Sequence, residues 1–273
     1  MNFIKVSFTV DQSLSDIILA ELSAGDFDTF EESDEGIHAY TEEERYDKGF
    51  VDEISGRYNV TYQTQIIPKE NWNEIWEKNY DPIIVSDQVL VRATFHSGLP
   101  TYPIEIVVDP KMSFGTGHHA TTHQMISAQL EIDHKGKSVL DLGTGTGILA
   151  ITAAKLGASH IEGSDIDEWC IANSRENFLL NDLADITLQK TAAQNFICSG
   201  PFDIVLANIN KNVLLEEMHY YADFCKPKGH LLLSGFYQKD ISDINEAALN
   251  LGFVLETQQT KDDWAQLTFI KSE

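Results

Sequence analysis

The sequence predicts a two-domain α/β protein, in which a doubly wound, mostly parallel sheet follows a small βαββαβ domain. From Lys137 onward, strand-like and helix-like segments alternate, which is typical of a parallel sheet covered by helices on both faces. The last two segments, 253–260 and 264–271, break this alternation and predict an antiparallel hairpin that closes the sheet. Residues 1–66 follow the order βαββαβ, which is typical of a ferredoxin-like sandwich.

The N-terminal segment, 1–66, carries the patterns of four strands and two amphipathic helices. The predicted strands are 2–10, 27–32, 36–40 and 58–67. The first helix is expected over Ser13–Ala24. The second is expected from Thr41 to Ile54, because Thr41 followed by Glu44 forms a capping box. We therefore expect this segment to form a ferredoxin-like domain that recognises the substrate.

Residues 67–81 predict a short amphipathic helix that links the two domains. Trp72, Trp76 and Tyr80 follow one another at intervals of four residues and therefore share one face of this helix. We interpret the aromatic stripe as a packing face rather than as a ligand site.

The remaining segment, 82–273, carries the larger sheet domain. Short strands are expected at 82–94 and 103–108, separated by a loop that contains glycine and proline. The strands of the main sheet are expected at 138–142, 160–165, 186–191, 202–208 and 230–236, with helices at 147–156, 168–181, 212–224 and 240–251.

The composition is that of an ordinary globular protein, with 42% apolar and 23% charged residues. No run reaches the ~18 apolar residues of a membrane span, and the N-terminus lacks the features of a signal peptide. The three cysteines form no CxxC pair, which argues against a disulfide framework or a zinc knuckle and suits a reducing cytoplasm. We expect a cytoplasmic protein without a membrane partner. Because no heptad pattern or large apolar face indicates self-association, we also expect a monomer.

The acidic charge is concentrated at the N-terminus. The net charge is −24, and residues 1–60 carry 15 acidic and 4 basic side chains. A field of this sign repels the phosphates of nucleic acids and attracts basic partners, so we expect no direct contact with nucleic acid. A solvated surface that confers solubility is the simpler and favoured interpretation of the charge.

A glycine-rich turn between a strand and a helix carries the clearest chemical signal. In VLDLGTGTGILA, which starts at Val139, the glycines Gly143, Gly145 and Gly147 let the backbone turn sharply and approach a ligand closely. Asp165 ends the next strand, where its carboxylate can reach the ribose hydroxyls of a nucleotide-like cofactor. A glycine-rich turn that binds no ligand is the alternative.

Two cofactor classes use such a turn. A nicotinamide fingerprint, GxGxxG, needs glycine at position 148, where this chain has Ile148. The observed spacing is GxGxG and follows Asp141, an acid that suits the cationic methionine end of S-adenosylmethionine. Together with Asp165 and the closing hairpin, this spacing predicts a Rossmann-like class I methyltransferase that uses S-adenosylmethionine.

Asn208 ends the fourth strand of the main sheet, in the segment ANIN. Ligands of open α/β sheets bind at the carboxyl ends of strands, so its amide is expected in the same crevice as Asp165. There it can accept a hydrogen bond from an amino group or hold part of the cofactor. The absence of an Asn-Pro-Pro-aromatic motif disfavours a nucleobase amine or a glutamine amide as the acceptor. Alternatively, Asn208 caps the following helix.

A second glycine-containing loop, DPKMSFGTGHHATT at 109–122, precedes the sheet domain and a helix expected near Thr121. Its two glycines and Phe114 predict a loop that can fold over the cofactor and exclude water. Two histidines in the loop and a third in the helix suggest a metal site. No acidic or thiol ligand accompanies them at a useful spacing, so we expect no metal to bind here. These histidines are His118, His119 and His123.

The motifs DPKMSFGTGHHATT, VLDLGTGTGILAI, GSDID and VLANI, in this order and spacing, closely resemble the PrmA family. Its members are S-adenosylmethionine-dependent methyltransferases of ribosomal protein L11 of the large subunit. The resemblance extends over the whole chain, and its specific element is the FGTG-H-TT loop. The chain departs from the family at HHA, where a Thr-His-Pro run is common, and at GTGTG, where Cys often follows the first glycine.

By matching motif, the resemblance implies that Thr122, Gly143, Asp165 and Asn208 bind the cofactor. It also implies that the N-terminal domain grips L11 while a flexible linker presents different amines to one active site. The acceptors would be lysine side chains, the N-terminal amine, or both.

The acceptor amine sets the main chemical requirement of such a reaction. A lysine amine has an ordinary pKa of about 10.4 and must lose its proton before it can attack the methyl group. Asn208 is the candidate for orienting the neutral amine, and no residue is placed by motif as a general base. The alternatives are a methyltransferase of RNA or of a small molecule, and a non-catalytic ribosome-assembly factor.

Overall fold

The computed structural model of the 273-residue chain describes residues 2–33, 36–67, 80–109, 111 and 115–273. Two compact units make up the chain, Met1–Asn79 and Tyr80–Glu273. Most of the expected linker helix, with Trp72 and Trp76, lies outside the described residues, as does Phe114.

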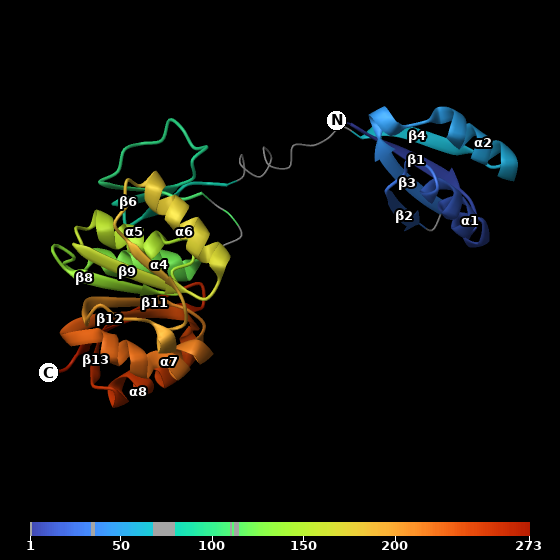
Figure 1. Ribbon diagram of the computed structural model, residues 1–273. Coiled ribbons are helices and arrows are strands. Elements are labelled where there is room, and N and C mark those ends of the chain that lie inside the picture. The colour runs from blue at the N-terminus through green and yellow to red at the C-terminus, as the bar shows by residue number, and fades with distance from the viewer. Residues whose placement is uncertain (1, 34–35, 68–79, 110, 112–114) are drawn as a thin grey trace. The chain divides into compact units, whose positions relative to one another are not determined.

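The first unit is a four-stranded antiparallel sheet with two helices on one face (Figure 1). Its elements are β1 (Phe3–Thr9), α1 (Gln12–Ser23), β2 (Thr29–Ser33), β3 (Gly36–Glu42), α2 (Lys48–Tyr58) and β4 (Tyr62–Ile67). The spatial order β2-β3-β1-β4 is that of a ferredoxin-like sandwich, as expected from the sequence. Ile4, Val6 and Phe8 alternate along β1 and pack against Ile18 and Leu22 of α1, so this unit has a core of its own.

The expected start of the second helix at Thr41 is wrong. Thr41 belongs to β3, where it pairs with Ile4 of β1, and its hydroxyl donates to the carbonyl of Asp26. The cap of α2 is Asp47, whose carboxylate accepts from the backbone N–H of Gly49 at 2.8 Å. Pairing with β1 satisfies the backbone of Thr41, and this long-range pairing outweighs the local capping pattern.

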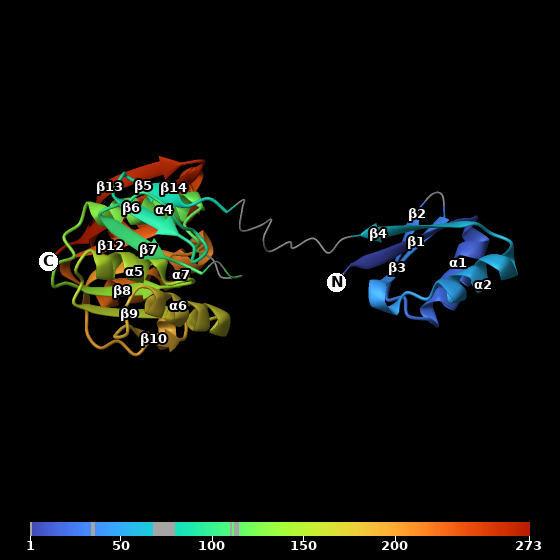
Figure 2. The same cartoon turned by 90° about the horizontal axis from the view of Figure 1, so that it is seen from above.

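The second unit contains a seven-stranded sheet in the order β10-β9-β8-β11-β12-β14-β13 (Figures 1 and 2). Its strands are β8 (Ser138–Leu142), β9 (His160–Asp165), β10 (Thr187–Lys190), β11 (Phe202–Asn208), β12 (Cys225–Tyr237), β13 (Phe253–Lys261) and β14 (Trp264–Lys271). The first five strands pair in parallel, whereas β14 pairs antiparallel with both β12 and β13. The predicted doubly wound sheet and its closing hairpin are therefore confirmed.

Helices cover both faces of this sheet. They are α4 (Ala120–Leu130), α5 (Ile148–Lys155) and α6 (Glu168–Leu180) on one face, and α7 (Lys211–Phe224) and α8 (Ile241–Asn250) on the other. Neighbouring residues of β8 belong to the cores on opposite faces of the sheet. Val139 packs in the core with α5, whereas Leu140 packs in the core with α7. The central strands β11 and β12 each contain a run of consecutive buried apolar residues, because helices cover both of their faces.

A small three-stranded sheet packs against α4 and α5. It consists of β5 (Ile83–Val85), β6 (Val89–Arg92) and β7 (Ile104–Val107). The buried amide of Asn181, the residue that follows α6, holds β7, since its Oδ1 accepts from Val107 N at 3.0 Å and its Nδ2 donates to Val107 O at 2.7 Å. The loop at 109–119 therefore starts from a fixed strand. In the described part of the chain, no helix combines the length and apolar character that crossing a membrane requires.

Candidate active site

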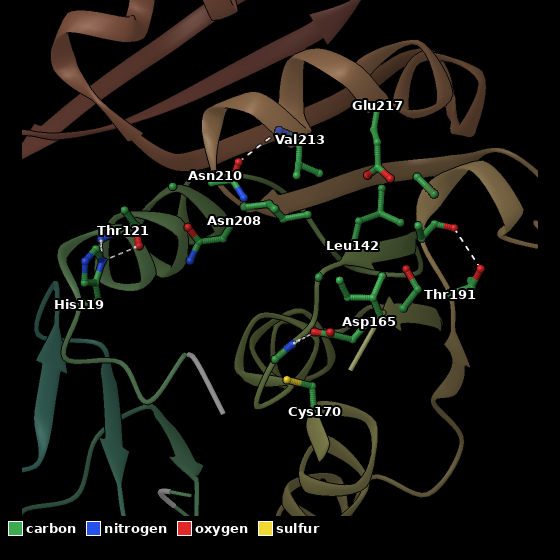
Figure 3. A pocket seen from close by; sticks show the side chains of 18 of the residues that line it. His119, Thr121, Leu142, Asp165, Cys170, Thr191, Asn208, Asn210, Val213 and Glu217 are labelled. Atoms are coloured by element: carbon green, nitrogen blue, oxygen red, sulfur yellow. Dashed lines mark hydrogen bonds between the residues drawn. The ribbon is translucent and has the colours of Figure 1, made fainter. Parts of the chain in front are cut away.

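A cavity of about 560 Å³ lies at the carboxyl ends of β8, β9 and β11 (Figure 3). Its volume is in the range of small-molecule sites, and its place is where parallel α/β sheets bind their ligands. Gly143, Asp165 and Asn208, which the sequence predicts as cofactor-binding residues, all line it. The fourth, Thr122, is fully buried beside the lining residue Thr121, and its hydroxyl has no hydrogen-bond partner among the described residues. Its role stays a prediction.

The turn after β8 depends on glycine for both its conformation and its packing. Gly143, Gly145 and Gly147 have φ of 68°, 56° and 81°, in the left-handed region that favours glycine. A Cβ atom on Gly143 would lie 2.8 Å from the side chain of Ile209. A Cβ atom on Gly147 would lie 2.5 Å from the ring of Phe178. Larger residues would therefore force the turn away from its neighbours.

The carboxylate of Asp165 is fixed at the end of β9. Its Oδ2 accepts from the backbone N–H of Gly145 at 2.9 Å, and its Oδ1 accepts from that of Asp167 at 3.0 Å. An ionised carboxylate has about four acceptor positions, so both oxygens can still accept from hydroxyl groups in the cavity. This geometry suits a vicinal diol, such as that of a ribose.

Asp141 is an unusual acid directly before the lining residues Leu142 and Gly143. Its side chain is fully buried, and its Oδ2 accepts from the hydroxyl of Thr144 at 2.7 Å. In the described part of the chain, Oδ1 has no hydrogen-bond partner. Burial raises the pKa of Asp141 to about 7, so at neutral pH the side chain is partly protonated. A cationic ligand nearby would favour its ionised form.

Asp141→Asn is expected to change how the stability of the ligand-free protein depends on pH. The pKa of about 7 in the folded protein lies above the ordinary value of 3.8, so the folded state binds this proton more tightly than the unfolded chain. The associated stability is fully present below about pH 4 and is lost as the pH rises to about 7. Relative to the variant, the wild type should lose between about 1 and 2 kcal/mol per pH unit in this interval.

The measurement is urea unfolding of both proteins at several pH values between about 5 and about 8. Parallel dependence of the two free energies of unfolding on pH would contradict the assigned pKa.

Asn208 is the last residue of β11 and lines the cavity. Its Oδ1 is buried and has no hydrogen-bond partner among the described residues. The alternative that Asn208 caps the next helix is wrong, because Asn210 is the cap of α7 and accepts from Val213 N at 3.2 Å. Asn208 therefore lines the cavity with an amide whose buried oxygen lacks a hydrogen-bond partner, which a donor on a ligand would satisfy.

The described part of the 109–119 loop rests on the glycine turn. The hydroxyl of Thr146 donates to the carbonyl of Gly115 at 2.5 Å. Asn177 of α6 joins the same turn to the start of the loop, since its Nδ2 donates to Thr146 O at 2.8 Å and its Oδ1 accepts from Asp109 N at 2.8 Å. His118 lies within 3.0 Å of the carbonyl of Asp81 through its Nε2 atom. The loop is thus held at both ends.

His119 has a structural part in this arrangement. It caps α4, because its Nδ1 accepts from the backbone N–H of Thr121 at 3.3 Å and lies 2.8 Å from the Thr121 hydroxyl. Its ring packs edge-on against Trp264, with ring centroids 4.6 Å apart, and both rings line the cavity. The second histidine of HHA therefore shapes the side of the cavity that adjoins the loop.

Comparison with known proteins identifies the family. A family model described as Ribosomal protein L11 methyltransferase (PrmA) matches residues 7–272. The chain belongs to the PrmA family. A protein named Ribosomal protein L11 methyltransferase from Porphyromonas gingivalis is 42% identical over 260 residues, which cover 93% of this chain and 90% of that protein. One of the same name from Phocaeicola vulgatus is 38% identical over 99% of both chains.

The fold agrees with PrmA membership. The crystal structure of ribosomal protein L11 methylase from Lactobacillus delbrueckii subsp. bulgaricus matches with a TM-score of 0.67 and 28% sequence identity. The match covers 71% of this chain and all of that one. The predicted class I methyltransferase fold is confirmed, and so is the resemblance to the PrmA family seen in the sequence.

The PrmA site also contains residues that sequence reasoning missed. Trp264 and Glu217 line the cavity, although they come from the closing hairpin and from the middle of α7. Asn177 and Asn181 fix the loop and β7, and both are buried. A signal was present for these two, since polar residues four apart at the end of a helix need partners elsewhere in the fold when they are buried. Nothing in the sequence around Trp264 or Glu217 indicates a place in the site.

Proposed function

We propose that this chain transfers methyl groups from S-adenosylmethionine to amino groups of ribosomal protein L11. Its membership of the PrmA family supports the reaction class, and the names of its relatives identify L11 as their substrate. The structural observation that carries the proposal is the unsatisfied Oδ1 of Asn208 in a cavity that also holds the carboxylate of Asp165. One group can accept from an amine and the other from ribose hydroxyls.

The residues around the cavity fit S-adenosylmethionine. Asp165 receives the ribose, the turn at Gly143 lets the backbone approach the ligand, and buried Asp141 becomes ionised beside a cationic ligand. Thr122 and Asn208 complete the binding residues that we assign. When bound, S-adenosylmethionine supplies an electrophilic methyl group.

The protein must align the acceptor amine with the methyl group and keep that amine neutral. Oδ1 of Asn208 accepts an N–H of the amine and directs the nitrogen lone pair toward the methyl group. Entry into the cavity removes water from the amine, which lowers its pKa and releases the proton to solvent. Nδ1 of His119 already accepts from Thr121, so we assign it no role as a base.

We assign recognition of L11 to the first unit and methyl transfer to the second. The excess of acidic side chains in residues 1–60 favours a basic protein partner and disfavours direct contact with nucleic acid. A linker at 67–81 lets one active site receive several amines, namely lysine side chains, the N-terminal amine, or both. We also propose that the protein acts as a monomer.

Mass spectrometry of purified, unmethylated L11 after incubation with this protein and S-adenosylmethionine tests the proposal. RNA and free amino acids serve as parallel acceptors, and peptide mapping identifies the methylated amines. We expect mass gains in single-methyl steps on L11 alone. Methylation of RNA instead would overturn the substrate assignment, and tight L11 binding without methyl transfer would indicate an assembly factor.

The same assay on the variant Asn208→Ala tests the role of Asn208. Loss of the acceptor that orients the amine is expected to slow methylation by about 10- to 100-fold, the value of one hydrogen bond to a reacting group. A rate equal to that of the wild type would remove Asn208 from the mechanism.

A further inference from the structure

Glu217 is the second carboxylate that lines the cavity, and the function proposed above gives it no role. It lies one helical turn beyond Val213 on α7, so both side chains face the cavity. Figure 3 shows Glu217 and Thr191 on one side of the pocket and His119 and Thr121 on the other. Glu217 therefore lies away from the loop and from the side that His119 shapes.

The carboxylate of Glu217 is held in place from within its own helix. The hydroxyl of Tyr221 donates to its Oε2 at 2.9 Å, and Tyr221 is fully buried. In the described part of the chain, Oε1 has no hydrogen-bond partner. One oxygen thus fixes the side chain, and the other remains available to a ligand.

The surroundings of Glu217 suit a flat aromatic base. Val213 lies near Glu217 in Figure 3, and the cavity is also lined by Ile166, which follows Asp165 in the sequence, and by Ala192, which follows Thr191. These side chains offer apolar surfaces to the faces of a ring. If Asp165 receives the ribose, the base attached to that ribose reaches this apolar side, and its edge is directed at a group such as Glu217.

We propose that Glu217 selects adenine, with Oε1 accepting an N–H from the 6-amino group of the base. This inference rests on the proposed function, since it requires S-adenosylmethionine in this cavity. An ionised carboxylate can only accept, so it pairs with an amino group and repels the oxo group that other purines carry at that position. Glu217 is thus a specificity-determining residue for the cofactor and takes no part in the transfer itself.

Isothermal titration calorimetry with two product analogues tests this assignment. S-adenosylhomocysteine carries the 6-amino group, and S-inosylhomocysteine carries an oxo group in its place. We expect the wild type to bind the adenosyl compound about 10- to 100-fold more tightly, because a hydrogen bond to a charged group contributes about 1.5–3 kcal/mol.

Glu217→Gln is the informative variant, because an amide can both donate and accept. It should bind the adenosyl compound about 10-fold more weakly than the wild type and lose most of the preference between the two compounds. Glu216→Gln is the matched control, since Glu216 is the exposed neighbour on α7 and is expected to leave both dissociation constants unchanged. An unchanged thermal midpoint establishes that both variants are folded.

The outcomes separate this inference from the function on which it rests. If Glu217→Gln keeps the wild-type preference, or if the wild type binds both compounds equally, the assignment of Glu217 is overturned and the proposed function stands. If the wild type binds neither compound, both fall.

Discussion

Asp165→Ala is expected to weaken the binding of S-adenosylhomocysteine by about 100-fold or more, the equivalent of two hydrogen bonds to a charged acceptor. The substitution removes the carboxylate that we assign to the ribose hydroxyls. It also removes the acceptor for the backbone N–H of Gly145, so the glycine turn loses a contact that holds it against β9. Because both effects weaken binding in the same cavity, we expect this substitution to cause one of the largest losses of affinity.

Calorimetry measures the dissociation constant, and Asp185→Ala serves as the matched control. Asp185 is exposed, precedes β10 and carries the same charge as Asp165. The control should bind the ligand as the wild type does, which separates a local contact from a general change in charge. An affinity for Asp165→Ala within a few fold of the wild type would refute the assigned role.

Deletion of residues 1–66 is expected to abolish methylation of L11 and to leave the affinity for S-adenosylhomocysteine unchanged. All described residues that line the cavity belong to the second unit, and the two cores of that unit consist of its own described residues. The first unit packs around its own core, so its removal leaves the core of the other intact. Without it, the substrate loses the surface that we assign to its recognition.

Two assays on the truncated chain separate the possibilities. Calorimetry with S-adenosylhomocysteine reports whether the second unit remains folded, and mass spectrometry of L11 reports methyl transfer. Methylation of L11 at the rate of the full chain would refute a recognition role for the first unit. Loss of both binding and transfer would show instead that the second unit needs the first for its stability.

The sequence was most informative where chemistry depends on a short local segment. Two features predicted the edge of the sheet where the cavity lies: the GxGxG turn after Asp141, and Asp165 at the end of the next strand. Asn208 was predicted in the same cavity because it also ends a strand of this sheet. These predictions succeed because parallel strands bring their carboxyl ends to one edge, so position along the chain implies position in space. The strand order of the first unit was predictable for a similar reason, since its βαββαβ pattern restricts the possible connections.

Local patterns failed where two segments competed for the same role. Thr41 matched a capping box, yet pairing with β1 placed it in a strand and left Asp47 to cap α2. Asn208 was a possible cap of the next helix, but β11 extends through Asn208, and Asn210 caps α7. Long-range pairing decides such cases, because a capping interaction contributes only about 1 kcal/mol.

By itself, the sequence determined the family, the class of fold and the edge of the sheet where the cavity lies. Only the tertiary structure decided which side chains from distant segments line the cavity, such as Trp264 beside His119 and Glu217 held by Tyr221. It also decided the pKa of Asp141, because that value depends on burial. Burial and contacts between distant segments result from packing, which a motif of neighbouring residues does not encode.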